Sequence, residues 1–322
     1  MPRFRAPLLF LIPVLPLAAQ TEPEPSVSAL AFRLASIPAV TGYEQPMVDT
    51  LLRLLPAARR DRAGNARIQL GGRSGRRLVV CPLDEPGYAV GHVRGDGYLT
   101  LRRLSGEVPP LFDQQLEGHR VTIQGRRGPV PGVVAVRSVH LTRGREEVSE
   151  APFAVDGAYV DVGAESRAQV MALGIGILSP VTLTKRPHRY GEGLLAAPVV
   201  GRRMACAALL DAVRQSNRRA KSLPPVTAGF VTQHRLSERG LRSLANELGP
   251  FDETLIVDGR PGARGSLQQS PDADSLTRPP ALGKVTHWSL PVAYSGTPVE
   301  SASIADADAL RDALVKWIGG DP

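Results

Sequence analysis

The sequence has few lysines, few cysteines and few charged stretches of one sign. Only four of its 39 basic residues are lysines, so arginine carries almost all of the net charge of +8. So strong an arginine bias is typical of codon composition, and no basic stretch interleaved with aromatic residues accompanies it. The scattered basic pairs indicate solvated faces. The sequence therefore predicts no nucleic-acid partner.

Two catalytic motifs are also missing from the sequence. It contains no Gly-x-Ser-x-Gly elbow, the turn that presents the nucleophile of many serine hydrolases. The glycine-rich stretch 71–75 lacks the lysine and the following helix that a phosphate-binding loop needs. The sequence therefore supports neither a serine nucleophile nor a nucleotide-binding loop. The acidic residues of the chain are the remaining candidates for catalysis.

The first 19 residues have the composition of a targeting segment. Arg3 and Arg5 precede an apolar run over 6–19 that ends in the small residues Ala18 and Ala19. This order predicts a secretory signal peptide over 1–19, with an uncleaved anchor as the alternative. The run is short and broken by prolines, so it does not suit a membrane span. We expect a secreted or periplasmic protein that has no membrane span after signal removal.

Cys81 and Cys206 are the two cysteines. Export would permit a disulfide between them. Both lie in apolar surroundings, which are equally typical of buried free thiols. The sequence leaves the two possibilities open.

The rest of the chain predicts an α/β domain that is interrupted by a smaller β domain. Between 91 and 195, short alternating runs are punctuated by Gly and Pro, as in a small all-β unit. Apolar residues outside this region follow helical spacing or form short buried strands. We expect 20–90 and 196–322 to build the α/β domain and 91–195 to be the insertion.

An acidic pair, Asp84 and Glu85, follows the apolar run that begins at Leu78. In an open α/β sheet, chemistry lies beyond the carboxyl ends of the strands. A metallohydrolase would place part of its site at such a strand end. The residue two before Asp84 is Pro82, however, and proline has no side chain that binds a metal.

Six short motifs follow one another along the chain, at 41–44 (Thr-Gly-Tyr-Glu), 61–65 (Asp-Arg-Ala-Gly-Asn), 81–90, 131–134, 140–141 and 161–166. In this order and spacing they resemble the tetrahedral and glutamyl aminopeptidases, two-metal exopeptidases that include endoglucanase-M-like proteins. Together the matching features cover most of the chain after the predicted signal peptide. The resemblance implies the three-layer α/β sandwich of zinc exopeptidases with an inserted small β-barrel.

The same resemblance implies that most metal ligands are replaced. Such enzymes hold two metal ions with a bridging Asp, two His and further carboxylates, and they use a Glu as general base. The first His falls on Pro82, and the bridging Asp falls near Gly201. The Glu pair falls on His234 and Arg235, and the last His falls near Gly296.

One ligand position keeps its residue type, Asp258, while Asp84 and Glu85 match the acidic residues that follow the first His. Arg202, Arg203 and Arg235 bring positive charge toward the same region. A buried carboxylate needs a partner, so we expect the three acids to pair with these arginines. A residual catalytic role of Asp84 and Glu85 is the alternative.

A rebuilt single-metal site is a further alternative. His234, Asp258, Asp84 and Cys81 would supply the mixed nitrogen, oxygen and sulfur donors that zinc accepts. Asp258 and His234 are therefore the candidate metal ligands.

The leading hypothesis is an exported aminopeptidase-like protein that holds no cofactor and serves as a peptide-binding or scaffold protein. The alternatives are an active aminopeptidase that uses zinc or cobalt, and the structural subunit of a homo-oligomer.

Overall fold

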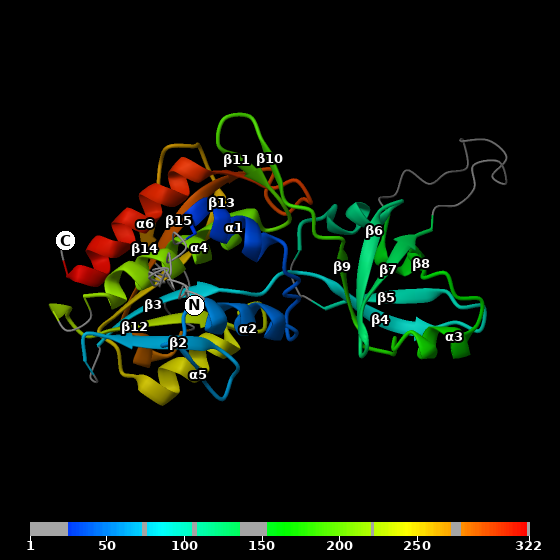
Figure 1. Cartoon of the computed structure of the whole chain (residues 1–322), viewed down its shortest axis with the longest axis horizontal. Helices are drawn as coiled ribbons and strands as arrows, with labels where there is room; N and C mark the ends of the chain where they lie inside the picture. The colour runs from blue at the N-terminus through cyan, green and yellow to red at the C-terminus, as the bar shows by residue number, and fades with distance from the viewer. Residues whose placement is uncertain are drawn as a thin grey trace, which may run out of the picture.

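The computed structural model describes residues 25–72, 76–104, 108–135, 153–219, 222–271 and 278–320. The predicted signal peptide, 1–19, lies outside these residues. The chain forms a large α/β sandwich and a smaller β-barrel that lie side by side (Figure 1). The chain passes from the sandwich to the barrel after residue 82 and returns after residue 183.

Ten strands form the sheet of the sandwich. In spatial order they are β1 (Arg59–Arg60), β2 (Ala66–Leu70), β12 (Val226–Val231), β3 (Arg77–Pro82), β13 (Glu253–Pro261), β15 (Lys284–Ala293), β16 (Ser301–Ser303), β11 (Leu194–Ala196) and β10 (His188–Tyr190), with β14 (Gln268–Pro271) paired to β15. The four central strands β12, β3, β13 and β15 are parallel, and the outer strands are antiparallel. The carboxyl ends of the central strands therefore meet at one edge.

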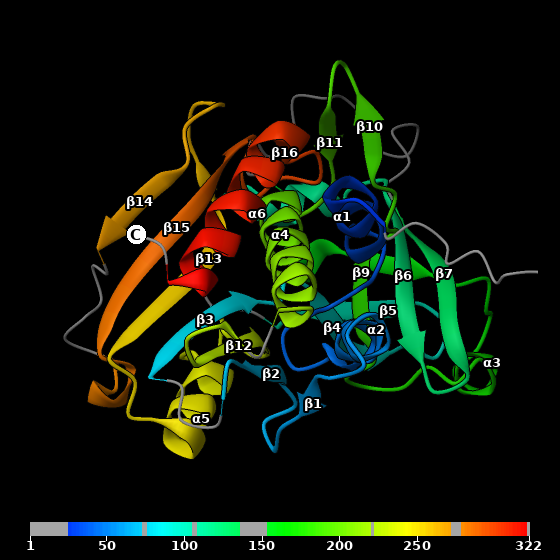
Figure 2. The same ribbon diagram turned by 60° about the vertical axis from the view of Figure 1, so that its left-hand side comes forward.

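Helices cover both faces of this sheet, as Figure 2 shows. Helices α1 (Val27–Ala35), α2 (Gln45–Leu54), α4 (Val200–Asn217) and α6 (Ile304–Gly319) share one apolar core, and α5 (Arg239–Leu248) packs in another. Successive side chains of β3 alternate between these two apolar cores, because the side chains of a strand point to opposite faces of the sheet. Val79 and Cys81 join the α4 side, and Leu78 and Val80 join the α5 side. The predicted three-layer sandwich is confirmed.

The barrel is closed by six strands and carries the small helix α3 (Arg167–Ala172) and the 3₁₀ turn η1 (Phe112–Leu116). Its strands, in order around the barrel, are β4 (Tyr88–Val93), β5 (Leu99–Arg103), β8 (Tyr159–Asp161), β7 (Gly128–Val134), β6 (Arg120–Gly125) and β9 (Pro180–Leu183). The predicted inserted β-barrel is thus present. Its strands occupy 88–183 rather than 91–195, because the hairpin β10–β11 pairs with the large sheet.

Helix α4 is the central helix of the sandwich and is buried along most of its length. The apolar spacing predicts it only from 204 to 213, but it begins at Val200. Its first turn therefore contains Arg202 and Arg203. Cations are unfavourable at a helix N-terminus, where the helix dipole is positive. These two arginines need nearby carboxylates to be stable there.

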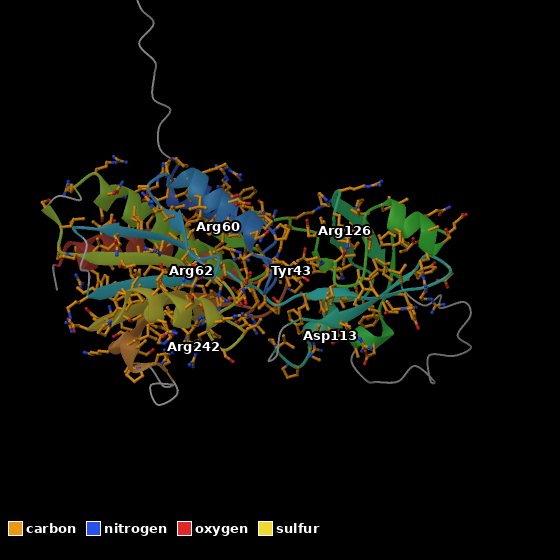
Figure 3. The ribbon with its side chains drawn as sticks, turned by 90° about the horizontal axis from the view of Figure 1, so that it is seen from below. Tyr43, Arg60, Arg62, Asp113, Arg126 and Arg242 are labelled. Carbon is orange, nitrogen blue, oxygen red and sulfur yellow. A yellow bond between two sulfur atoms is a disulfide. The ribbon has the colours of Figure 1, made fainter. Side chains whose placement is uncertain are left out.

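Two polar contacts join the sandwich to the barrel. The Tyr43 hydroxyl donates to the Leu178 carbonyl oxygen over 2.9 Å, and Figure 3 shows Tyr43 where the two bodies meet. Lys185, on the returning segment, binds Glu85 on the outgoing one. Within the described ranges, no helix is both long and apolar enough to cross a bilayer.

Candidate functional site

The candidate site lies at the carboxyl edge of the parallel strands, beside the N-terminus of α4. Asp84 follows β3, His234 follows β12, and Asp258 lies in β13. This edge is where an α/β sheet binds its ligands.

Asp84 is fully buried and accepts hydrogen bonds from three residues. Its Oδ2 atom accepts from the Thr41 hydroxyl at 3.1 Å and from the Arg235 backbone N–H at 2.8 Å. Arg202 Nη1 donates to Asp84 Oδ1 at 3.1 Å and to the Asp84 carbonyl oxygen at 2.6 Å. The carboxylate is thus saturated by partners from three separate segments.

Arg202 bridges Asp84 to Asp258. Its Nε and Nη2 atoms donate to the two oxygens of Asp258 at 3.0 and 2.6 Å, which is the bidentate geometry of a strong arginine–carboxylate pair. Burial alone would raise the pKa of Asp258, but the Arg202 guanidinium outweighs it and the pKa lies below the ordinary value. One cation therefore binds the carboxylates of two adjacent strands.

Glu85 belongs to a second ion cluster on the other side of the same strand end. Its Oε2 atom accepts from Lys185 Nζ at 2.6 Å and from Arg203 Nη2 at 2.9 Å, and its Oε1 accepts from the Ala39 N–H at 3.0 Å. Burial would raise the pKa of Glu85, yet the two cations hold it below the ordinary value. Arg203 also donates to the Leu83 carbonyl oxygen. The side chains of this cluster are buried. The cluster therefore joins α4 to both segments of the chain that connect the sandwich with the barrel.

Two further buried carboxyl groups, Glu44 and Glu300, have no cationic hydrogen-bond partner among the described residues. Glu44 Oε1 accepts from the N–H groups of Gly42 and Gln233 at 3.0 and 2.8 Å. Glu300 accepts from the N–H groups of Gly201 and Gly296 at 3.0 and 3.1 Å. Burial raises the pKa of both groups above the ordinary value. Each therefore gives up its charge at a higher pH than a freely exposed glutamate does.

His234 lies beside this network. Its Nε2 atom is 3.8 Å from Glu238 Oε1, and its buried Nδ1 atom has no hydrogen-bond partner among the described residues. Burial and, after it, the charge of Arg202 lower the pKa of the imidazole. The neutral ring therefore predominates at pH 7.

Cys81 and Cys206 form a disulfide, with a Cα–Cα distance of 5.4 Å. It joins the end of β3 to α4, one turn after Arg202. The choice that the sequence left open is therefore settled in favour of the disulfide. Cys81 cannot act as a thiolate ligand in this state, so the sulfur donor of the predicted rebuilt site is absent.

Gly201 faces the same edge and has no room for a side chain. A Cβ atom built there would lie 2.3 Å from Val292 Cγ1 and 2.9 Å from the Gly259 Cα atom. Backbone does not yield at such distances as the end of a flexible side chain does. The start of α4 thus approaches β13 closely because both Gly201 and Gly259 lack a side chain.

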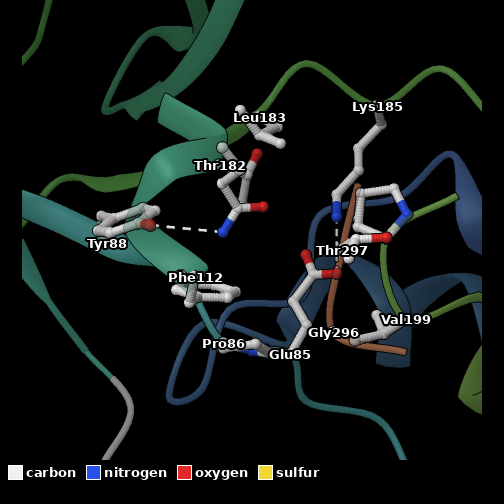
Figure 4. A pocket seen from close by; sticks show the side chains of 13 residues that line it. Glu85, Pro86, Tyr88, Phe112, Thr182, Leu183, Lys185, Val199, Gly296 and Thr297 are labelled. Atoms are coloured by element: carbon white, nitrogen blue, oxygen red, sulfur yellow. Dashed lines mark hydrogen bonds and ion pairs between the residues drawn. The ribbon is translucent and has the colours of Figure 1, made fainter. Parts of the chain in front are cut away.

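A crevice between the two bodies adjoins the Glu85 cluster (Figure 4). Pro86, Tyr88 and Phe112 line one side, and Val199 and Thr297 line the other. Its volume is about 30 Å³, which is the space of about one water molecule. In this arrangement of the two bodies it does not admit a peptide side chain.

Comparison with known proteins identifies the family of this fold and site. Residues 64–284 match the model of the M42 glutamyl aminopeptidases, which is more than half of the chain. This chain belongs to the M42 glutamyl aminopeptidase family. The predicted resemblance is therefore confirmed at the level of the family.

Among curated proteins, this M42 chain is similar to SgcX and FrvX of Escherichia coli, both aminopeptidases by prediction, and to the lysyl aminopeptidase of Pyrococcus furiosus. The identities are 29% over 192 residues, 26% over 259 and 26% over 223. The alignments cover 58%, 78% and 68% of this chain, and 50%, 68% and 62% of those proteins. The chain thus spans about half the length of SgcX.

Solved structures show the same fold. The TET1 peptidase of Pyrococcus horikoshii superposes with a TM-score of 0.80 at 18% identity, over 91% of this chain and 99% of that one. An endoglucanase of Thermotoga maritima gives a TM-score of 0.67 at 16% identity, over 90% and 96% of the two chains. At these identities the likeness establishes the fold alone.

M42 aminopeptidases are typically metal-dependent, but the donor set of this chain does not fit a metal pair. Two-metal sites need several carboxylate and imidazole ligands around an open space. Here a guanidinium lies between Asp84 and Asp258. The described residues contain no group of three or more His, Cys, Asp or Glu side chains that would hold an ion.

The structure places each residue that the sequence singled out. The expected ion pairs form, with Asp84 and Asp258 on Arg202 and Glu85 on Arg203. Asp84 and Glu85 point to different cations, and the structure does not bring them together as a catalytic pair. The roles of Asp84 and Glu85 in catalysis, and of Asp258 and His234 in metal binding, stay predictions.

Sequence reasoning did not assign a role to Lys185, Glu44 or Glu300. Glu44 lies in a motif that carried the family resemblance, 41–44, so that motif was a usable signal for it. Glu300 lies only in the stretch near Gly296 where the last His of the family falls. Lys185 gave no such signal, because it follows a strand of the inserted domain and meets Glu85 across 100 residues of sequence.

Proposed function

We propose that this protein is a non-hydrolysing member of the M42 family. The observation that carries the proposal is the Arg202 guanidinium, which binds Asp84 and Asp258 where the family resemblance places the metal centre. An ion in that space would meet a fixed positive charge. At 4 Å and an effective dielectric of 20, that repulsion is about 4 kcal/mol for each unit of charge.

The surrounding positions support the same proposal. The bridging carboxylate of the family resemblance falls near Gly201, where a Cβ atom alone would clash with Val292 and Gly259. The general base falls on His234 or Arg235, and the first imidazole ligand falls on Pro82. A single substitution therefore does not restore the centre.

Metal content and peptide hydrolysis test the proposal together. The purified chain is incubated with excess zinc, cobalt or manganese, desalted, and analysed by elemental mass spectrometry. It is then assayed on a panel of aminoacyl-p-nitroanilides, with the Pyrococcus furiosus lysyl aminopeptidase treated identically as a positive control. We expect no stoichiometric metal and no turnover above the buffer rate. Two ions per chain with turnover would establish an active aminopeptidase instead.

An assembly subunit is the non-catalytic role that the surface favours. The barrel exposes three large apolar side chains on α3 and the segment after it, namely Met171, Ile177 and Leu178, at 64%, 66% and 58% exposure. Exposed apolar residues that lie together are typical of protein-binding surfaces. The similar TET1 peptidase assembles into a tetrahedron or a large octahedral shell. We propose a homo-oligomer that uses this face of the barrel.

Light scattering of the eluting peak measures this assembly. The wild type is expected to elute as a multimer, and Ile177→Asp is expected to shift it to smaller species. Leu236→Asp, at an exposed position of the sandwich (44%), serves as the matched control and is expected to leave the mass unchanged. A monomeric wild type would remove assembly as the proposed function.

The proposed site of action is the periplasm or the outside of the cell. The disulfide between Cys81 and Cys206 supports this, because such bonds persist in oxidising compartments. Fractionation of cells that produce the chain with a C-terminal tag tests the location, and N-terminal sequencing tests cleavage after residue 19. Full-length chain in the cytoplasmic fraction would argue against export.

A further inference from the structure

A groove lies on the outside of the barrel, between helix α3 and strand β4, which are neighbours in Figure 1. Its volume is about 320 Å³, within the usual range of small-molecule sites. It is lined by His92, Val93, Arg126, Arg167, Met171 and the segment 174–177. Among the described residues, it shares no lining residue with the crevice between the two bodies. The groove is therefore a separate candidate site that the barrel forms by itself.

Much of the groove surface is apolar. Val93 and Ile175 belong to the buried core of the barrel, whereas Met171 and Ile177 are largely exposed. A ligand with an apolar body that covers Met171 and Ile177 would remove their side chains from water, which is favourable. The groove therefore suits a ligand that is apolar over most of its length.

The charged side chains of the groove all have the same sign. Arg126 and Arg167 line it, and no aspartate or glutamate of the described chain does so. Arg167 Nε donates to the Val93 carbonyl oxygen at 3.1 Å, which anchors the guanidinium beside β4 through one of its three nitrogens. Guanidinium groups bind carboxylates with charge-assisted hydrogen bonds. The complementary ligand therefore carries a carboxylate at one end.

The backbone around the groove favours an alkyl chain over a peptide. The Arg126 N–H donates to the Gly174 carbonyl oxygen at 2.9 Å. The Gly176 carbonyl oxygen accepts from the Ser179 N–H at 3.1 Å, and the Gly176 N–H donates to Ser179 Oγ at 3.0 Å. These groups are already engaged, so a peptide would leave its own N–H and C=O groups unpaired against apolar side chains, at a cost. An alkyl chain needs no hydrogen bonds.

We propose that this groove binds a free long-chain fatty acid. The carboxylate lies on the guanidinium groups of Arg126 and Arg167, and the alkyl chain covers Met171 and Ile177. The site goes beyond the proposed function, because it needs neither hydrolysis nor assembly. Met171 and Ile177 also belong to the proposed assembly face, so a bound fatty acid and a neighbouring subunit exclude each other. This last consequence alone rests on the proposed function.

Calorimetric titration with dodecanoate, kept below its micelle concentration, tests the site. We expect one dodecanoate per chain in the wild type. Dodecylammonium has the same alkyl chain with the opposite charge, and it is expected to bind at least tenfold more weakly. Octanoate is also expected to bind at least tenfold more weakly, because each buried CH₂ group contributes about a fourfold gain in affinity. Equal binding of octanoate and dodecanoate, or of dodecylammonium and dodecanoate, would overturn the inference.

Variants locate the bound chain. Arg126→Gln with Arg167→Gln removes both guanidinium groups and is expected to lower the dodecanoate affinity at least tenfold. R102Q/R120Q is the matched control, since it removes two exposed barrel arginines outside the groove, and it is expected to bind as the wild type does. Met171→Gln, at an exposed helical position, is expected to lower the affinity about threefold through lost apolar contact. Equal losses in the two double variants would overturn the inference.

A further variant separates binding from assembly. Leu178 lies on the proposed assembly face but does not line the groove, and its φ of 68° is a conformation that asparagine adopts readily. L178N is therefore expected to weaken assembly and to keep the groove. Light scattering gives its mass, and calorimetry gives its dodecanoate affinity.

The outcomes of the two measurements are distinct. A monomeric wild type that binds dodecanoate supports the inference and refutes assembly. A multimeric wild type that dodecanoate shifts to smaller species supports both. No dodecanoate binding by either the wild type or L178N overturns the inference, whatever the mass of the wild type. Sedimentation with phosphatidylglycerol vesicles in the absence of dodecanoate binding would also overturn it, because the cations would then contact a membrane surface.

Discussion

A buried ion pair of the sandwich and an exposed ion pair of the barrel differ in how much water surrounds their charges. The sandwich buries Glu85 and Arg203 together at its strand ends, each about 1% exposed. The barrel leaves its pair Arg102–Asp156 in solvent, at 73% and 79% exposure, and shows apolar side chains such as Ile177 on its surface. The difference teaches that burial, and not the presence of an ion pair as such, decides how much a charged residue contributes to stability.

Burial decides how much each ion pair contributes to the free energy of unfolding. Breaking a buried pair leaves a desolvated charge without a partner and costs about 3–5 kcal/mol. An exposed pair contributes about 0–1 kcal/mol, because water screens it. The same substitution in the two bodies should therefore have very different effects, and the following predictions test this contrast from the largest effect to the smallest.

Arg203→Met is expected to give the largest loss. It removes one of the two cations from Glu85 and a donor from the Leu83 carbonyl oxygen. The free energy of unfolding should fall by about 3–5 kcal/mol, measured by urea unfolding at pH 7. Arg102→Met on the barrel is the matched control and should change it by less than about 1 kcal/mol. Equal effects of the two substitutions would contradict the contrast between the bodies.

Removal of the disulfide is expected to have the next largest effect on stability. Replacing both Cys81 and Cys206 by Ser removes a link across 125 residues, and loss of such a bond typically costs about 2–5 kcal/mol. Urea unfolding of the double variant measures the loss. Alkylation of the denatured, unreduced wild type should find no free thiol. Two alkylated cysteines would show that the bond does not form in solution.

Glu44→Gln should change the pH dependence of stability. Because burial raises the folded-state pKa of Glu44 above its ordinary value of 4.5, its neutral form stabilises the fold below pH 4.5. That contribution is lost as the pH rises through the folded-state pKa. Glutamine stays neutral, so E44Q should gain stability relative to the wild type as the pH rises from 5 toward 8.

Thermal unfolding from pH 3 to 8 measures this effect. Glu85 and Asp258 have lowered pKa values, so their contribution is present above their ordinary pKa values and is lost as the pH falls through the folded ones. E44Q and the wild type should both lose this stabilising contribution of Glu85 and Asp258 at low pH. Glu117→Gln, at an exposed position of the barrel, should follow the wild type throughout. A difference between E44Q and the wild type that is constant with pH would refute the assignment.

Tyr43→Phe should have the smallest effect. It removes one hydrogen bond between the sandwich and the barrel, from the Tyr43 hydroxyl to the Leu178 carbonyl oxygen. At a partly exposed position this costs about 0.5–1.5 kcal/mol. Hydrogen exchange of the segment around Leu178 should rise in the variant, while the strands of the sandwich keep their protection. Loss of protection in both bodies would mean that the two unfold as one unit.

Much of the fold could be predicted from periodicity. The apolar patterns over 226–231 and 238–248, each followed by a turn, indicate a strand and a helix within a residue of β12 and α5. The Gly and Pro content of 259–283 indicates a loop, and there the structure differs. Strand β13 continues to Pro261 and β14 forms at Gln268–Pro271, because pairing with β15 overrides the local Gly and Pro content.

Only part of the candidate site could be predicted from the sequence. The pairing of the acids with arginines followed from charge and burial, and Arg202 and Arg203 did take Asp84, Asp258 and Glu85. Which arginine takes which acid depends on where α4 begins, and the apolar spacing placed that start four residues too late. Lys185 reaches Glu85 only because the barrel returns the chain beside its exit point.

The sequence by itself determined the class of the fold, the family and the need for internal counter-ions, because these depend on residue types and their order. The tertiary structure decided which atoms neutralise which, that Cys81 meets Cys206, and that Gly201 has no room for a side chain. The physical reason is that such contacts join segments up to 189 residues apart, as between Glu44 and Gln233. Local sequence patterns do not indicate which of these distant segments come together.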